Sequence, residues 1–438
     1  MAIAQIPERI PTVIVDRFLL LAEESGAAKL VLQVELHFDQ TLDEDRLAKA
    51  LDLLLDAEPV LGCRMVPDPD LPFWQRLGRE ERKNFCFTLS EPEYLNFRNS
   101  SQDPCRGPQV QACLFRKSRS DQLLIKICHQ AADAGGAKEI AGILSSIYQR
   151  LEKEPGFKPE PNLSGCRDWS QITSQIPLWA YPIILLNHLR ESWSNLVPHR
   201  TNSLKLQAGP AEPLTYVLRH IPPERTEKIA RFGKERNATI NDVIVAAYHR
   251  ALVKAVPWDG KSALRMKTTL DLRRWYLPGR KAEGICNLSS FESPNLGFKL
   301  GKDLAETTAL ISAYSRKRKK SWIGFTEGWM YHSILRINPF SYQRLRDWGI
   351  KTLPKILEIL EQSFPNTLTN MGEIKPETVE FGAKPKSAWL LSPFLLPPIF
   401  ISGLSGHQNT LTLCAGVPVY AGKTIESFYD LILAELPS

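Results

Sequence analysis

Strand-like and helix-like patterns alternate along the whole chain, and this alternation limits the possible folds more than any other feature. Residues 29–38 alternate apolar and polar side chains, as a half-buried strand does, and residues 41–57 then follow a helical period. Thr41 and Glu44 have the spacing of a capping box, and Pro59 ends the helix. The alternation predicts a fold of the α/β or α+β class.

The alternation continues to the C-terminus with one interruption. Residues 122–129 read as a strand, and a helix with one apolar face follows a turn at Gly135 and Gly136. The pattern loosens between about residues 155 and 213, where prolines and tryptophans gather. We therefore expect two lobes, each a mixed sheet with helices, and divide the chain into residues 1–185, a linker of residues 186–213, and residues 214–438.

Patterns in the second lobe are equally regular. Strands are expected at residues 214–222 and 264–274 and from residue 366 onward, and helices at residues 224–237, 239–256, 303–320 and 424–436. No internal repeat or low-complexity segment is visible.

Cysteine usage and the N-terminus indicate the compartment. The eight cysteines stand singly, without a CxxC pair that would indicate a zinc or redox site. Unpaired thiols suit a reducing compartment, and the apolar run of residues 18–22 is too short for a signal peptide. We expect a cytoplasmic protein without a bound metal. Its 43% apolar content excludes a disordered chain.

The longest uncharged stretch, residues 387–406, approaches the length of a membrane span. Pro393, Pro397 and Pro398 lie inside it, so two buried strands joined at the prolines are the preferred interpretation, with contact to lipid as the alternative. The net charge is +7, from 55 Lys and Arg against 48 Asp and Glu. This charge is mild for 438 residues and does not indicate a nucleic-acid partner.

His129 is the first candidate for chemistry, because it ends a predicted apolar strand. A histidine there is held rigidly, and its ordinary pKa of about 6.5 lets neutral imidazole accept a proton. Asp133 follows four residues later. This spacing alone is weak, because His220 and Glu224 repeat it elsewhere in the chain.

The wider segment CHQAADAGGAKEI, residues 128–140, resembles the HHxxxDG motif of the coenzyme A-dependent acyltransferase superfamily. That superfamily contains nonribosomal-peptide condensation domains, alcohol and polyketide-associated acyltransferases, and wax ester synthases. Other segments resemble its motifs in the same order, namely residues 47–65, Thr239 with Asn241 and Asp242, Asp271 with Arg273, Asn287, and Asn370 with Gly372. The resemblance therefore covers nearly the whole chain.

The resemblance implies two chloramphenicol-acetyltransferase-like lobes with an active-site tunnel between them. His129 would be the general base, and Asp133 would pair with Arg273 to hold the catalytic loop. Gly135 and Gly136 would shape that loop, and the residues beside the tunnel would be Cys128, Asn370 and Gly372. Cys128 stands where the superfamily usually has its first histidine, and we expect an inert, buried thiol there.

The implied reaction moves an acyl group from a coenzyme A or phosphopantetheinyl carrier-protein thioester to a small-molecule alcohol or amine. It needs no tightly bound cofactor, and an acidic carrier protein would act in trans. We expect a monomer in natural product biosynthesis, with neither a nucleic acid nor a transmembrane segment. The alternative is a catalytically inactive, condensation-like binding or scaffold protein, because Ala134 replaces the glycine of the motif.

Two further features stay open between a functional and a structural interpretation. The run of residues 315–320, SRKRKK, fits coenzyme A phosphates or an acidic carrier, and it equally fits the solvated end of a helix. The ten tryptophans are expected mostly in the core or between the lobes, with a few beside an acyl tunnel.

Overall fold

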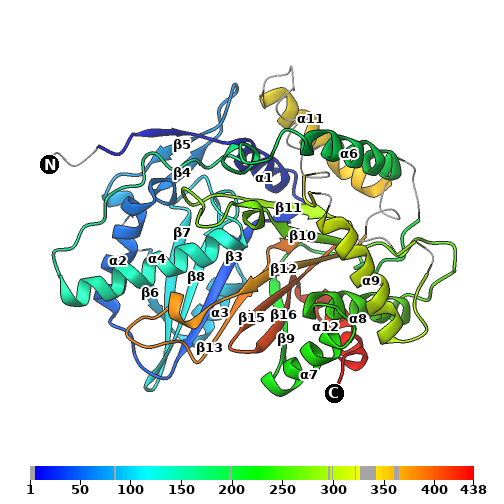
Figure 1. Cartoon of the computed structure of the whole chain (residues 1–438). Helices are drawn as coiled ribbons and strands as arrows, with labels where there is room; N and C mark the ends of the chain where they lie inside the picture. The colour runs from blue at the N-terminus through cyan, green and yellow to red at the C-terminus, as the bar shows by residue number, and fades with distance from the viewer. Residues whose placement is uncertain are drawn as a thin grey trace.

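The computed structural model describes residues 5–82, 85–196, 200–293, 296–297, 299–320, 322–325, 342–359 and 365–438. Its architecture is mixed α/β, as predicted (Figure 1). The first large sheet has the order β13 (Ser387–Leu391), β3 (Val31–Phe38), β8 (Ser120–Cys128), β7 (Val110–Lys117) and β6 (Cys86–Leu89).

The second large sheet is built mainly from the C-terminal half of the chain. Its order is β11 (Ser289–Glu292), β10 (Lys267–Asp271), β12 (Thr367–Glu373), β15 (Ile401–His407), β16 (Thr410–Pro418), β14 (Phe394–Leu395) and β2 (Ala28–Lys29), and β9 (Leu214–Ile221) also pairs with β16. A small sheet joins β1 (Arg9–Pro11), β5 (Phe73–Arg76) and β4 (Cys63–Val66).

Helices cover both large sheets. Those packed on the first sheet are α2 (Glu44–Ala57), α3 (Glu91–Asn99) and α4 (Ala134–Lys153). Those grouped against the second are α7 (Pro223–Lys234), α8 (Ile240–Ala255), α9 (Leu304–Lys319) and α12 (Gly422–Glu435). The other helices of the described residues are α1 (Ile14–Glu24), α5 (Ser170–Thr173), α6 (Ala180–Leu196) and α11 (Tyr342–Ile359).

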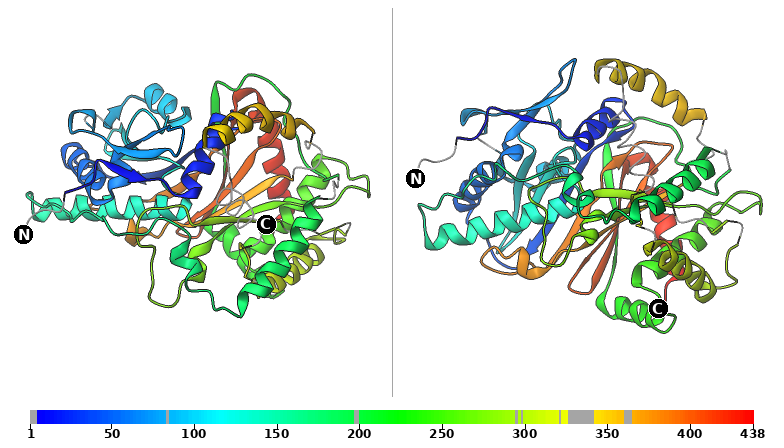
Figure 2. Two further views of the ribbon diagram at one scale, coloured as in Figure 1. Left: turned by 90° about the horizontal axis from the view of Figure 1, so that it is seen from above. Right: turned by 45° about the horizontal axis from the view of Figure 1, so that its top comes forward.

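The two halves of the molecule exchange strands. Figure 2 shows the N-terminal part, blue to cyan, beside the green-to-red part. Strand β13, from the end of the chain, pairs antiparallel with β3, and β2 from the beginning pairs with β14. The boundaries predicted at residues 185 and 213 remain predictions. Helix α6 crosses the first of them, so residues 186–196 are helical rather than irregular.

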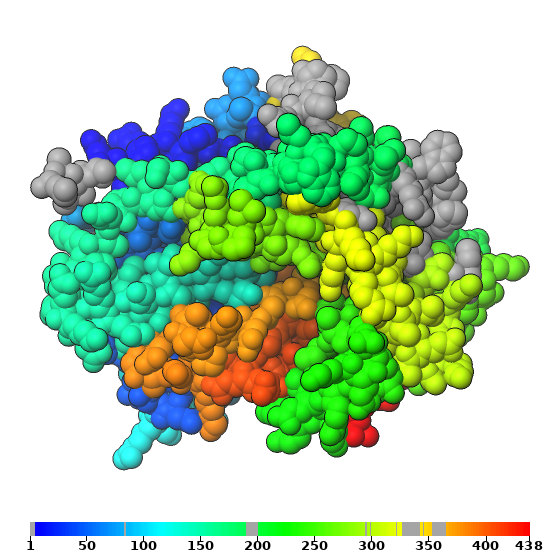
Figure 3. All heavy atoms as spheres, viewed as in Figure 1, coloured from blue at the N-terminus to red at the C-terminus, as the bar shows by residue number. Residues whose placement is uncertain are grey.

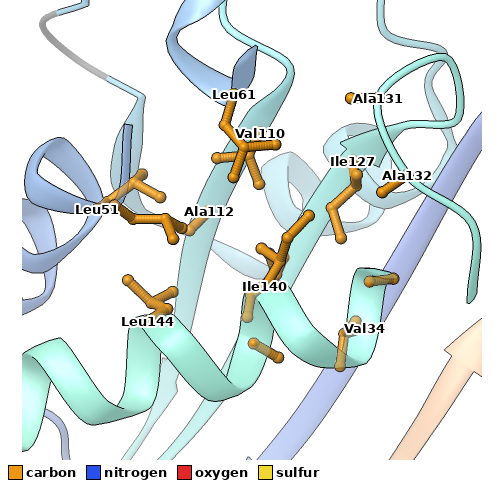
Figure 4. Close-up of a cluster of buried hydrophobic side chains, with 14 of the residues drawn as sticks. Val34, Leu51, Leu61, Val110, Ala112, Ile127, Ala131, Ala132, Ile140 and Leu144 are labelled. Atoms are coloured by element: carbon orange, nitrogen blue, oxygen red, sulfur yellow. The ribbon is translucent and has the colours of Figure 1, made fainter. Parts of the chain in front are cut away.

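Apolar side chains from helices and strands form the core of the first half. Leu51 of α2 and Ile140 and Leu144 of α4 lie against side chains of the sheet, among them Ala112 and Ile127 (Figure 4). All five are at most 2% exposed. Burying a side chain of the size of leucine contributes about 1.5–3 kcal/mol, so this layer is a major source of stability.

Two local predictions for this half were wrong. Strand β3 is not half-buried, because every residue but His37 is buried. Its polar side chains are paired instead of solvated: Gln33 donates to the Tyr216 hydroxyl at 3.0 Å, and Glu35 forms an ion pair with Arg98 at 3.0 Å. Tyr216 belongs to β9, so the second half of the chain covers the face that was expected to meet water.

The start of α2 also differs from the prediction. Its N-cap is Asp43, whose side chain accepts from the amide of Arg46 at 2.9 Å, so Thr41 and Glu44 do not form the capping box. Aspartate is as strong an N-cap as threonine or stronger, and the helix therefore begins closer to the apolar residues that it buries.

The uncharged stretch of residues 387–406 forms buried strands, as preferred. Strand β13 and most of β15 lie at its two ends, with Pro397 and Pro398 between them. Within the described part of the chain, no helix is both long and apolar enough to cross a membrane.

We predict an acid-sensitive site inside α8. The ring of His249 is fully buried, and neither ring nitrogen has a hydrogen-bond partner within the described structure. Burial lowers its pKa from 6.5 to about 4. Between these values the unfolded chain binds the proton more tightly, so stability should fall by up to about 3 kcal/mol as the pH drops from 6.5 towards 4.

Urea unfolding at a series of pH values measures this loss. The His249→Leu variant should lose less stability than the wild type over the same interval. Parallel pH dependences of the two proteins would contradict the prediction.

Candidate active site

His129 is the first residue after β8, and backbone contacts fix its position. Its own amide donates to the carbonyl of Leu30 at 2.9 Å. The side-chain amide of Asn287 donates to the carbonyls of His129 at 2.9 Å and of Gln130 at 3.1 Å. The Asn287 oxygen lies 3.1 Å from Nδ1 of His129. Asn287 therefore holds both the backbone and the ring of this histidine.

These contacts assign the tautomer of His129. Because the Asn287 Nδ2 group donates to two carbonyls, Oδ1 is the atom that faces the ring, and it accepts only from a protonated Nδ1. Burial lowers the pKa of His129 below 6.5, so the ring is neutral at pH 7. The unprotonated nitrogen is then Nε2, which has the lone pair that a general base needs.

Asp133 forms an ion pair with Arg273 at the start of α4. Nη1 of Arg273 lies 3.0 Å from both carboxylate oxygens, and Asp133 also accepts from the amides of Gly136 at 2.8 Å and Leu288 at 2.7 Å. Burial alone raises the pKa of Asp133, but Arg273 and the two amides outweigh it and hold the pKa below its usual value. The pair implied by the resemblance is thus present, and it joins the two halves of the chain.

The two glycines do not form a turn, which corrects that prediction. Both lie in the first turn of α4, which begins at Ala134 with Asp133 as N-cap. A Cβ on Gly135 would lie 2.5 Å from Nη1 of Arg273, and one on Gly136 would lie 3.1 Å from the carbonyl of Cys286. The glycines are needed for close approach, not for conformational freedom. Ala134 adopts no left-handed conformation, so its Cβ causes no backbone strain.

Arg167 also holds the loop that follows His129, and sequence reasoning missed it. Its guanidinium donates to the carbonyls of Ile285 at 2.9 Å and Ala131 at 3.3 Å, and it pairs with the fully buried Asp16 at 2.7 Å. The Trp169 ring nitrogen donates to the carbonyl of Asn287 at 3.0 Å. Both residues come from the irregular region before residue 213, where no spacing in the sequence indicated a role.

The residues predicted beside the tunnel come from two strands, β8 and β12. Cys128 is fully buried on β8, and burial raises the pKa of its thiol well above 9.0, as expected for an inert cysteine. Asn370 and Gly372 lie on β12, where Asn370 contacts Asn241 at 2.9 Å. Among the described residues, no hydrogen bond connects Asn370 or Gly372 to His129. Their place beside a tunnel remains a prediction.

Two other expectations can be compared with the structure. The basic run forms the C-terminal end of α9, which agrees with the solvated-helix interpretation. The tryptophans are not uniformly internal, because Trp179 and Trp348 are 66% and 56% exposed. Trp329 and the side chain of Trp193 lie outside the described residues. All eight cysteines are free.

Comparison with solved structures identifies the fold. The trichothecene 15-O-acetyltransferase TRI3 of Fusarium sporotrichioides superposes with a TM-score of 0.71, over 98% of this chain and 95% of that one. The first condensation domain of the calcium-dependent antibiotic synthetase gives 0.70, over 97% and 95%. The chain has the condensation-domain fold.

Other structures with this fold extend the range of known activities. Polyketide synthase associated protein 5 of Mycobacterium tuberculosis matches with a TM-score of 0.66 over 98% of both chains. An epimerization domain of tyrocidine synthetase B gives 0.63 over 99% of this chain. Sequence identity is 14–16% in these four comparisons, so the likeness establishes the two-lobe fold only. No protein-family model matches the chain, and no curated protein is similar to it in sequence.

Proposed function

We propose that the chain is a condensation-type acyltransferase. It would move an acyl group from a coenzyme A or carrier-protein thioester to an alcohol or amine, as a cytoplasmic monomer with any carrier acting in trans. The observation that carries the proposal is the imidazole of His129, whose pKa burial lowers below 6.5 and whose Nδ1 is held by Asn287. The fold supports it, because structures of this fold include an O-acetyltransferase and condensation domains.

The reaction that we propose needs one base that later acts as an acid. Nε2 removes the proton from the acceptor hydroxyl or amine while that group attacks the thioester carbonyl. The tetrahedral intermediate then loses its C–S bond, and the imidazolium returns the proton to the departing sulfur. The Asn287 oxygen accepts from Nδ1 throughout, and it stabilises the imidazolium while the positive charge exists.

Arg273 and Asp133 have a different part in this proposal. Asp133 is 2% exposed and fully engaged, with both of its oxygens accepting hydrogen bonds. It therefore holds the start of α4 and the segment of Leu288 together around His129 and does not exchange protons. This rigid frame would hold the donor and the acceptor close together, and their proximity would supply the remainder of the rate enhancement.

The pH dependence of catalysis is predicted from the pKa of His129. Only the neutral ring can act as base, so kcat/KM should rise with pH through one ionisation whose apparent pKa lies below 6.5. Rates measured from pH 4.5 to pH 8, with a thioester donor that the protein turns over, test this prediction. A rise centred well above 6.5 would contradict the assignment of His129 as the base.

The experiment for the proposed function is a screen with purified protein. Acyl-coenzyme A and acyl-carrier donors are combined with alcohol and amine acceptors, and thiol release and the acylated product are followed together. The His220→Ala variant is the matched control, because His220 has the same four-residue spacing to an acidic residue but bonds to Thr412 on β16.

Three outcomes of this screen are distinct. Transfer that depends on His129 and not on His220 supports the acyltransferase. Exchange of an α-proton without thiol release would replace it with epimerisation, an activity named for one structure of this fold. Thioester binding without either reaction would favour the inactive scaffold.

A further inference from the structure

Helix α6 presents an apolar face to solvent. Ala180 and Ile184 are at most 2% exposed and attach the helix to the protein. The opposite side is apolar and exposed, unlike that of an ordinary surface helix: Leu186 is 67% exposed, and Leu178, two residues before the helix, is 86% exposed. The exposed apolar side chains of α6 and of the two residues before it are Leu178, Trp179, Ile183, Leu185, Leu186 and Leu189. We call these six residues the α6 face.

Cationic side chains flank the α6 face on two sides. The ring of Trp179 lies 6.2 Å from that of Trp322, which follows the basic end of α9. The exposed cations at that end are Arg316, Lys317, Lys319 and Lys320. On the other side, the amide of Leu277 donates to Gln175 at 3.1 Å, which brings the exposed cations Arg274, Arg280 and Lys281 close to the start of α6.

The three segments lie together on one side of the molecule. Figure 3 shows the green surface of the α6 region above the light-green surface around residues 275–281 and the yellow end of α9. Figure 1 shows α6 at the outer edge of the molecule, with the end of α9 beside it. The α6 face is thus a projecting surface and not the floor of a groove.

We propose that the α6 face and its flanking cations bind the surface of an anionic lipid bilayer. Large apolar side chains that project from one helix need a partner into which they can insert, and the headgroup–acyl boundary accepts them without a matching shape. The cations attract anionic headgroups, and tryptophan favours the interfacial depth. An acidic protein would complement the cations but not the exposed apolar side chains. The proposal is independent of acyl transfer, because it uses no residue of the His129 site.

Vesicle flotation with the full chain tests this surface. Vesicles of phosphatidylcholine with a third phosphatidylglycerol should carry the protein at low salt, and pure phosphatidylcholine vesicles should carry much less. Leu185→Glu combined with Leu186→Glu should reduce the partition coefficient at least about tenfold, because charge is placed where apolar side chains insert. Lys319→Gln with Lys320→Gln should weaken binding to the anionic vesicles specifically.

The matched control is Leu71→Glu, since Leu71 is 54% exposed in the N-terminal half, outside the α6 face. This variant should bind as the wild type does, and circular dichroism should show all variants folded. Absence of vesicle binding, or binding that survives both double substitutions, would overturn the proposal. It would also be overturned if the leucine substitutions changed the oligomeric state without vesicles, because the α6 face would then be a contact between copies of the chain.

Discussion

The His129→Ala variant is expected to lose about 10²–10⁴-fold in kcat/KM for acyl transfer while remaining folded. The substitution removes Nε2, the atom that we propose takes the acceptor's proton. The backbone amide of residue 129 still donates to Leu30, and the Asn287 amide still donates to the carbonyls of residues 129 and 130. Thiol release measures the rate, and thermal unfolding by circular dichroism checks the fold.

His220→Ala again separates a specific effect from a general one. It removes an exposed histidine that has the same spacing in sequence, and it should leave the rate within about twofold of the wild type. Turnover by His129→Ala at the wild-type rate would contradict the role of His129. A parallel loss in both variants would indicate damage to the fold and not to catalysis.

The Arg273→Ala variant is expected to lose about 3–5 kcal/mol of the free energy of unfolding, as for any buried pair that loses one partner. Asp133 is 2% exposed, so without Arg273 its carboxylate would lie buried with only two backbone amides as donors. Urea unfolding followed by fluorescence gives the free energy. The same variant should lose activity, because α4 and the segment of Leu288 are no longer held together.

An exposed ion pair supplies the control for this stability prediction. Arg106 pairs with Asp103 at 3.2 Å, but its side chain is 88% exposed, so Arg106→Ala should cost at most about 1 kcal/mol. Combining Arg273→Met with Asp133→Asn should cost less than Arg273→Ala, since no unpaired charge remains buried. Equal losses for Arg273→Ala and Arg106→Ala would contradict the structural role of the pair.

Local features of the fold were predictable from the sequence because their causes are local. The strand before His129 was predicted at residues 122–129, and β8 ends at Cys128. The helix after Thr239 was predicted as well, since Thr239 and Asp242 form a true capping box and buried apolar residues follow. The ion pair of Asp133 with Arg273 was expected only from the resemblance to acyltransferases, because no pattern joins residues so distant in sequence.

Features that depend on tertiary pairing could not be predicted in this way. Tyr216 of β9, from the second half of the chain, covers a face of β3 that reads as exposed in the sequence. Arg167 reaches carbonyls of Ala131 and Ile285 from an irregular segment, so its role depends on the folded backbone and not on its neighbours in sequence. The tautomer of His129 could not be predicted for the same reason, because Asn287 comes from the opposite half of the chain.

Nitrogen-15 NMR of the histidine rings tests the central claim most directly, and it requires no knowledge of the substrate. The resonances of His129 are assigned by their absence in His129→Ala. At pH 7.5 the structure predicts a neutral ring with a protonated Nδ1 and an unprotonated Nε2, and in Asn287→Ala the preference for this tautomer should weaken. A proton on Nε2 in the wild type, in either the neutral or the charged ring, would contradict His129 as the base.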